Sequence, residues 1–250
     1  MSSSTTSAQY LSNKDIPVAE RLIVALDVPT AAAARRMVEE LGDTVVFYKV
    51  GLELFMSGDY FELVDWLIAQ GKKVFVDLKF FDVPQTVQSA VRQLSHCGAT
   101  FATVHGNDSI LSAAASAKGD LKLLAVTVLT SLDQGDIEDL GFKTEVRELV
   151  LSRARRAVAA GCDGVIASGI EAPALRKQLG DDFIVVSPGI RPVQNTDDQK
   201  RTVDVEEAFL NGADYIVVGR PIKEPATFAS PKEAAEDIQR RIHILFVGPR

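Results

Sequence analysis

The sequence contains few of the residues that build disulfides, metal centres and membrane spans. Only two cysteines occur, Cys97 and Cys162, and neither has CxxC spacing. This pattern predicts free thiols in a reducing compartment rather than a disulfide or a zinc site. The three histidines are scattered without companions at metal-binding spacing, which disfavours a metal centre: they are His96, His105 and His243. No apolar run approaches the roughly 18 residues of a membrane span, so we expect no membrane partner.

An excess of positive charge is also missing. The 27 Lys and Arg residues are outnumbered by 34 Asp and Glu residues, for a net charge of −7. This balance argues against a nucleic-acid partner, which would need clustered basic residues. Residues 1–15 are polar and rich in Ser and Thr, without the apolar segment of a signal peptide. We therefore expect a cytoplasmic protein in which residues 1–20 form a flexible arm.

What the sequence does contain is a repeated unit: a short apolar run, a polar or glycine-containing turn, and a segment with helical periodicity. The apolar runs lie at 22–26, 45–50, 73–78, 100–104, 122–129, 164–167, 183–187 and 215–219. Helical periodicity is clear at 31–41, 60–70, 87–97, 146–160 and 172–179. This alternation predicts an α/β fold, a (β/α)8 TIM barrel formed as a single domain by residues 21–250. The alternative is an open doubly wound sheet, which normally uses fewer strands, and no GxGxxG motif follows the first run.

The stretch KVFVDLKFFDVPQT, at 73–86, places three charges where an apolar strand ends. Side chains of a strand repeat every two residues, so Asp77 and Lys79 should point the same way and touch, with Asp82 beyond them. Asp82 precedes Pro84 and lies three residues before Gln85, which predicts that Asp82 caps the next helix. A structural ion pair and a catalytic acid–base group explain the three charges equally well at this point.

In a barrel of this kind the active site lies at the carboxyl ends of the strands. The expected strand ends carry polar or charged residues: Asp27, Lys49, Asp77, Lys79, His105, Thr130, Ser131, Ser168, Arg191 and Arg220. His105 and Ser168 also fit ordinary solvated strand ends. Four basic groups on one rim of an acidic protein predict an anionic ligand, and they are Lys49, Lys79, Arg191 and Arg220.

The last two strands are followed by SPGIRP at 187–192 and GRPI at 219–222. The loops after strands seven and eight are the usual phosphate site of such barrels. Gly189 and Gly219 allow a close backbone approach, and Arg220 can bind phosphate with two hydrogen bonds. The same glycines would also suit plain tight turns. The polar segment 191–204 is typical of a lid that closes over a ligand.

Six motifs in this order carry a resemblance to a known family. They are ALD (25–27), YKVG (48–51), DLKFFDVPQT (77–86), VTVLTS (126–131), SPGIRP (187–192) and VGRPI (218–222). Over residues 20–245 the chain resembles the orotidine 5′-phosphate decarboxylase family. The resemblance implies a homodimeric barrel enzyme without metal or organic cofactor. It would convert orotidine 5′-monophosphate (OMP) to uridine 5′-monophosphate (UMP) and CO2, the last step of de novo UMP synthesis.

The resemblance also implies roles for individual residues. The catalytic charges would be Lys49, Asp77, Lys79 and Asp82, with Lys79 as the proton donor to C6 of the pyrimidine. The other substrate-binding positions would be Asp27, Thr86, Thr130, Ser131, Pro188, Arg191, Gln199, Gly219 and Arg220. Asp82 and Thr86 would reach the neighbouring subunit's site. Gln194 is a nearby alternative to Gln199 as the lid glutamine.

Two other functions remain open for the sequence. Related barrels with the same DxKxxD core are magnesium-dependent 3-keto-L-gulonate 6-phosphate decarboxylases or hexulose-phosphate synthases, and Glu53 keeps a metal ligand after the second strand possible. SPGIRP and the long lid segment favour the nucleotide. A non-catalytic barrel that binds a phosphorylated ligand is the second alternative, and the intact set of Asp77, Lys79 and Asp82 argues against it.

Overall fold

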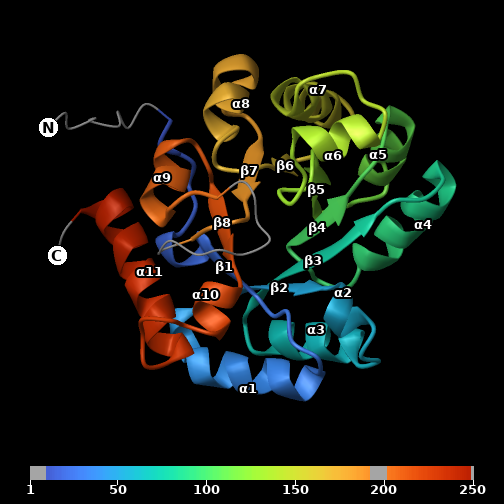
Figure 1. Ribbon diagram of the computed structural model, residues 1–250. Coiled ribbons are helices and arrows are strands. Elements are labelled where there is room, and N and C mark those ends of the chain that lie inside the picture. The colour runs from blue at the N-terminus through green and yellow to red at the C-terminus, as the bar shows by residue number, and fades with distance from the viewer. Residues whose placement is uncertain (1–9, 192–201, 249–250) are drawn as a thin grey trace, which may run out of the picture.

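A closed barrel of eight parallel strands forms the centre of the computed structural model, which describes residues 10–191 and 202–248. Each strand pairs with the next in the chain, and β8 pairs with β1 (Figure 1). The strands are β1 (Leu22–Ala25), β2 (Phe47–Gly51), β3 (Lys73–Phe80), β4 (Phe101–Val104), β5 (Lys122–Val126), β6 (Gly164–Ile166), β7 (Ile184–Ser187) and β8 (Tyr215–Val218). The predicted (β/α)8 fold is confirmed.

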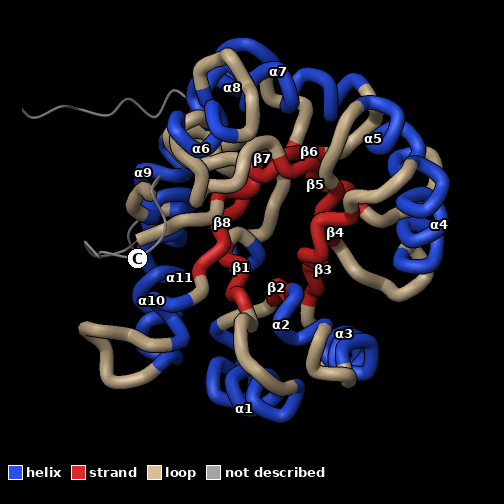
Figure 2. The backbone as a smooth tube through the Cα atoms, turned by 45° about the vertical axis from the view of Figure 1, so that its right-hand side comes forward, coloured by secondary structure: helices blue, strands red, loops and turns tan. Residues whose placement is uncertain are grey.

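Helices enclose the ring of strands, as Figure 2 shows. They are α1 (Ala31–Leu41), α2 (Leu52–Phe55), α3 (Tyr60–Ala69), α4 (Pro84–Leu94), α5 (Asp108–Ala115), α6 (Gln134–Asp139), α7 (Val146–Ala159), α8 (Ala172–Leu179), α9 (Val205–Leu210), α10 (Arg220–Lys223) and α11 (Pro231–Val247), with 3-10 turns η1 (Val18–Glu20) and η2 (Gly42–Thr44). No helix within the described ranges is long and apolar enough to cross a membrane.

The strands are apolar on both faces because each face meets a different part of the core. Outward side chains pack against the helices, while inward ones fill the barrel. At the amino-terminal end of the barrel the rings of Phe47, Phe101 and Tyr215 pack together, with centroids of Phe101 5.1 Å from each of the other two. This aromatic layer fills the amino-terminal end of the barrel with side chains.

Asp214 ties several elements together below that layer. Its carboxylate is fully buried and accepts hydrogen bonds from Arg176 of α8 at 2.7 Å and from the Val185 N–H of β7 at 2.9 Å. Ser12 and Lys14, from the segment predicted to be a flexible arm, bind the other carboxylate oxygen at 2.6 and 3.0 Å. Residues 10–14 are therefore attached to the base of the barrel.

The predicted helix cap at Asp82 is wrong. Helix α4 begins at Pro84, three residues earlier than the periodicity indicated, and Val83 occupies the cap position. The Asp82 carboxylate accepts the N–H of Val83 at 2.6 Å, one residue before the helix. Proline suits the first helical position because it has no N–H to satisfy there. The cap therefore moves to the residue before Pro84, and Asp82 remains in the loop.

Candidate active site

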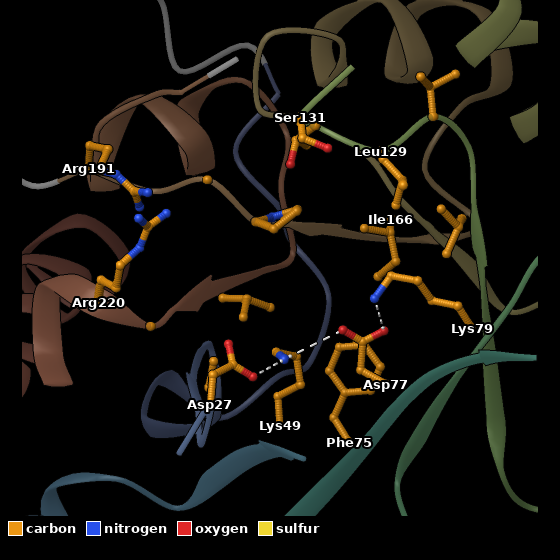
Figure 3. Close-up of a pocket in the computed structure, with 18 of the residues that line it drawn as sticks. Asp27, Lys49, Phe75, Asp77, Lys79, Leu129, Ser131, Ile166, Arg191 and Arg220 are labelled. Carbon is orange, nitrogen blue, oxygen red and sulfur yellow. Dashed lines mark hydrogen bonds and ion pairs between the residues drawn. The ribbon is translucent and has the colours of Figure 1, made fainter. Parts of the chain in front are cut away.

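A cavity of about 280 Å³ opens at the carboxyl ends of the strands (Figure 3). Its lining includes residues from the ends of β1, β2, β3 and β8 and from the loops after β5 and β7. The sequence-predicted residues that line it are Asp27, Lys49, Asp77, Lys79, Thr130, Ser131, Pro188, Arg191, Gly219 and Arg220. The four basic groups expected to share one rim therefore do face one cavity.

A row of alternating charges crosses the floor of this cavity. Lys49 Nζ lies 2.9 Å from Asp27 and 3.5 Å from Asp77 Oδ2. Lys79 Nζ donates to Asp77 Oδ1 at 2.9 Å, so the expected contact between the two side chains is present. Asp77 thus stands between two ammonium groups, and Figure 3 shows the row running from Asp27 to Lys79.

The surroundings shift the pKa values of the two central residues of this row, Asp77 and Lys49, toward their charged forms. Burial by itself raises the pKa of Asp77, but Lys49 and Lys79 outweigh it and hold that pKa below its ordinary value, helped by hydrogen bonds from Lys79 and Thr103. Burial lowers the pKa of Lys49, yet Asp77 and Asp27 reverse this effect and leave it raised. A carboxylate and two lysines are therefore held close together in a partly buried site.

Two arginines occupy the other end of the cavity. Arg191 and Arg220 lie side by side in Figure 3, across the cavity from Lys79. Gly189 has φ +76°, a backbone conformation that glycine adopts without strain, so this turn needs glycine. Gly219 has φ −114° and is the residue before the short helix α10. Two neighbouring guanidinium groups, beside glycine backbone that a ligand can approach closely, make this end of the cavity suitable for phosphate.

Lys223 is a lining residue that the sequence interpretation missed. Its Nζ donates to the backbone oxygen of Asp27 at 3.0 Å, which holds the ammonium group at the rim beside Arg220. Lys223 lies three residues after Arg220, the spacing that places two side chains on one face of a helix. A prediction that the GRPI loop continues as a helical turn would have found it.

Several predicted residues lie away from the cavity. Asp82 and Thr86 are exposed and do not line it. Glu53, the metal-ligand alternative, is likewise exposed and outside the lining. Gln199 and Gln194 are outside the described residues. Within the described part of the chain, no group of three or more His, Cys, Asp or Glu side chains is arranged to hold a metal ion.

His105 and Ser168 do not line the cavity either. His105 belongs to a second cavity of about 420 Å³ between α5 and α7, where its ring packs against Phe81 and its Nε2 lies 3.4 Å from Arg153. Burial, with the nearby charges of Arg153 and Lys79, lowers the pKa of His105. Ser168 is buried. The structure therefore gives neither residue a place in the charged cavity.

The fold and this cavity define a barrel protein with a row of alternating charges at one end of its cavity and a pair of arginines at the other. Residues 20–238 match the model of the Orotidine 5′-phosphate decarboxylase / HUMPS family. The match covers most of the chain, and the chain belongs to this family.

Proteins described as orotidine 5′-phosphate decarboxylase align with this chain over nearly their whole length. A protein described as orotidine 5′-phosphate decarboxylase from Methylococcus capsulatus is 65% identical over 241 residues, covering 96% of this chain and 98% of the relative. One from Xanthomonas axonopodis pv. citri is 50% identical over 237 residues, with 93% and 96% covered. The crystal structure of orotidine 5′-phosphate decarboxylase from Lactobacillus acidophilus superposes with a TM-score of 0.79 at 36% identity, covering 89% of this chain and 99% of that one.

Proposed function

We propose that this protein is a carboxy-lyase that converts OMP to UMP and CO2, completing de novo UMP synthesis. The observation that carries the proposal is Asp77 between Lys49 and Lys79, at the end of a cavity whose opposite end carries Arg191 and Arg220. A nucleoside monophosphate has the matching polarity, with a phosphate at one end and a base at the other. The family match and the full-length alignment to decarboxylases support the same substrate.

Lys79 performs the central step in this proposal. Loss of CO2 from C6 leaves a carbanion that the pyrimidine ring delocalises poorly, so the enzyme must stabilise negative charge at that carbon. A fixed ammonium group does this and then donates its proton to C6, which completes UMP. Asp77 keeps the Lys79 side chain aimed, because its carboxylate holds the Lys79 ammonium group at 2.9 Å. These groups supply the chemistry without a metal or an organic cofactor.

Asp77 would also stand near the substrate carboxylate. Two like charges at close range raise the energy of the bound substrate, and departure of CO2 relieves that repulsion. We assign the larger contribution to stabilisation of the carbanion, since the Lys79 ammonium interacts more strongly as negative charge develops at C6.

The remaining residues bind the substrate in this proposal. Asp27 and Lys49 would hold the ribose hydroxyls, while Thr130 and Ser131 would face the pyrimidine. The phosphate site would be formed by Pro188, Arg191, Gly219 and Arg220, with Gln199 of the segment 191–204 bridging phosphate and base. Phosphate binding far from C6 supplies binding energy that is expressed at the reacting carbon.

We further propose that the enzyme is a homodimer with shared sites, in which Asp82 and Thr86 act in the partner's cavity. Their exposure on the isolated chain supports this arrangement, as do the exposed apolar side chains beside Asp82, Phe81 (66%) and Val83 (62%). Helix α2 follows β2, the strand beside β3, and this helix and the residue after it expose further apolar side chains: Leu52, Phe55 and Met56. Such apolar surface is typical of a protein–protein interface.

The two cysteines are compatible with a cytoplasmic location. Cys97 and Cys162 are both free, and burial together with the nearby Asp163 raises the pKa of Cys162 to about 12. Cys162 is therefore protected from reaction as a thiolate. We place the enzyme in the cytoplasm on the basis of these thiols and of its biosynthetic role.

The decisive experiment measures the loss of OMP absorbance with the purified protein, with and without EDTA. Turnover that is unaffected by chelation supports the proposed function. Turnover abolished by EDTA would favour the metal-dependent sugar-phosphate relatives and make Glu53 the next residue to mutate. Binding of OMP or UMP without turnover would instead identify a non-catalytic binding protein.

A further inference from the structure

Strand β3 departs from regular pairing at its catalytic residues. It pairs with β4 at Val76↔Ala102 and again at Phe80↔Val104, with a register shift between these two pairs. Asp77, Leu78 and Lys79 of β3 therefore face a single residue of β4, Thr103. Such bulges remove ladder hydrogen bonds and re-aim side chains, and they are common next to active sites.

Lys79 adopts an unusual backbone conformation within this bulge. Its φ is +49°, and no other non-glycine residue in the described chain has a positive φ. Long side chains seldom occupy this region, and a residue persists there only when its surroundings enforce it. The direction of the Lys79 ammonium group therefore depends on whatever holds its backbone.

Thr103 provides that support. Its side chain is completely buried, its Oγ1 accepts the backbone N–H of Lys79 at 2.9 Å, and its hydroxyl donates to Asp77 Oδ1 at 2.8 Å. The same Asp77 oxygen accepts a hydrogen bond from Lys79 Nζ at 2.9 Å. The single Thr103 hydroxyl therefore contacts the carboxylate of Asp77 and the backbone of Lys79, the two residues of this ion pair. A buried N–H left without an acceptor is strongly unfavourable, and Thr103 replaces the ladder partner that the bulge removes.

We propose that Thr103 is a positioning residue for the decarboxylation, acting through Asp77 and Lys79 rather than on the substrate. The proposal rests on the proposed function. The Thr103 hydroxyl fixes the Asp77 carboxylate and the Lys79 backbone, so that the ammonium group points into the cavity. Thr103 is not among the residues that line that cavity.

Three variants separate positioning from simple packing. Thr103→Val keeps the shape but removes the hydroxyl, which leaves the Lys79 N–H without its acceptor and Asp77 without one donor. Thr103→Ser keeps the hydroxyl and loses a methyl group. Thr127→Val is the matched control, because Thr127 is also buried (1% exposed) but its hydroxyl donates to the backbone oxygen of Ile166 at 2.8 Å.

We expect Thr103→Val to lower kcat about 10- to 100-fold, the range for losing a hydrogen bond to a charged group. The KM for OMP and the affinity for UMP should change less than threefold, because neither phosphate nor ribose is involved. Thr103→Ser should restore most of kcat, and Thr127→Val should keep kcat within about twofold even if it lowers Tm as much as Thr103→Val does.

The pH dependence of kcat/KM is a measurement that a change in packing alone would not shift. The lowered pKa of Asp77 keeps the carboxylate ionised until the pH falls through that value, and kcat/KM then declines. The Thr103 hydrogen bond favours the charged form, so its loss raises the pKa of Asp77. The acid limb of Thr103→Val should therefore lie at higher pH than that of the wild type.

The outcomes are distinguishable. A wild-type protein that leaves OMP unchanged overturns the proposed function, and it is measured before any variant. Normal wild-type turnover with an equally active Thr103→Val overturns only the role of Thr103, as does an equal loss of kcat in Thr127→Val. If Thr103→Val does not fold, Thr103→Ala is compared with Thr103→Ser at 10 °C below the lower of their Tm values, and equal kcat values would refute the proposal.

Discussion

At the scale of single residues, the charges of the site depend on one another. Lys49 is shared by Asp27 and Asp77, whereas Lys79 has Asp77 as its carboxylate contact in the described chain and stays 35% exposed. An exposed ammonium group with one strong partner is free to direct its other protons into the cavity. The position of Lys79 at the end of the row therefore supports the proposal that Lys79, rather than Lys49, donates the proton.

Replacing Lys79 should abolish turnover without unfolding the barrel. We expect Lys79→Ala to lower kcat by about 1000-fold or more, because both charge stabilisation and the proton donor are lost. Circular dichroism and Tm should stay close to wild type. Lys118→Ala is the control: Lys118 also pairs with an aspartate, Asp163 at 2.6 Å, but lies outside the cavity. Near-normal turnover of Lys79→Ala would rule out its role as proton donor.

Arg220 should act on phosphate rather than on chemistry at C6. We expect Arg220→Ala to raise the KM for OMP about 10- to 100-fold through loss of charge-assisted hydrogen bonds. Orotidine, which lacks the phosphate, should be turned over equally poorly by the variant and the wild type. Steady-state kinetics with both substrates measure the preference for OMP. The control is Arg240→Ala, which removes a surface arginine paired with Asp237 and should leave both rates unchanged. An unaltered KM for OMP in Arg220→Ala would contradict the phosphate site.

At the scale of elements, sequence periodicity located helices and strands well where packing against the core requires a regular apolar spacing. The helices expected at 31–41 and 172–179 begin and end at those residues, since one face of each packs on the barrel. The strand expected at 122–129 stops at Val126, and the helix expected at 87–97 begins at Pro84. Both differences arise at loops, where backbone geometry rather than apolar spacing determines the boundary.

The candidate site was predictable to the extent that it follows from barrel geometry. Residues such as Asp27, Lys49 and Arg220 are far apart in sequence but lie within or just after neighbouring strands, so a closed barrel brings them to one cavity. Their binding roles remain predictions. Thr103 could not be found this way, because a threonine inside a strand looks like core, and its contacts depend on a bulge that has no sequence signature.

The base of the barrel gives a prediction about stability at this scale. Asp214 joins α8, β7 and the segment 10–14, and its neutralisation leaves the buried Arg176 guanidinium with only the more distant, exposed carboxylate of Asp181 at 3.7 Å. We expect Asp214→Asn to lower the free energy of unfolding by about 3 kcal/mol or more. Urea unfolding followed by circular dichroism measures this loss. The control is Asp237→Asn, a partly exposed aspartate whose partner Arg240 is exposed, and its effect should be near zero. Values of kcat at 25 °C should not change, and an equal stability of the two variants would contradict the structural role of Asp214.

At the scale of the whole molecule, we propose that one chain does not complete the site. Asp77 and Lys79 line their own cavity, while Asp82, only three residues after Lys79, is exposed outside it. The loop that carries Asp82 also exposes Phe81 and Val83, which an interface would bury. A two-fold dimer would place each Asp82 at the partner's site, so every active site would draw residues from both chains.

Mixing two inactive variants tests this sharing directly. In a heterodimer of Lys79→Ala and Asp82→Ala, one site keeps both Lys79 and the partner's Asp82, and the other site lacks both. Purified heterodimers, selected through two different affinity tags, should therefore show about half of the wild-type activity per dimer. Heterodimers of Lys79→Ala with Asp77→Ala are the matched control: both residues belong to the chain's own cavity, so neither site is intact and no activity should return. Equal inactivity of both heterodimers would show that each chain completes its own site, whereas recovery in the first pair alone requires that Asp82 cross to the neighbouring subunit.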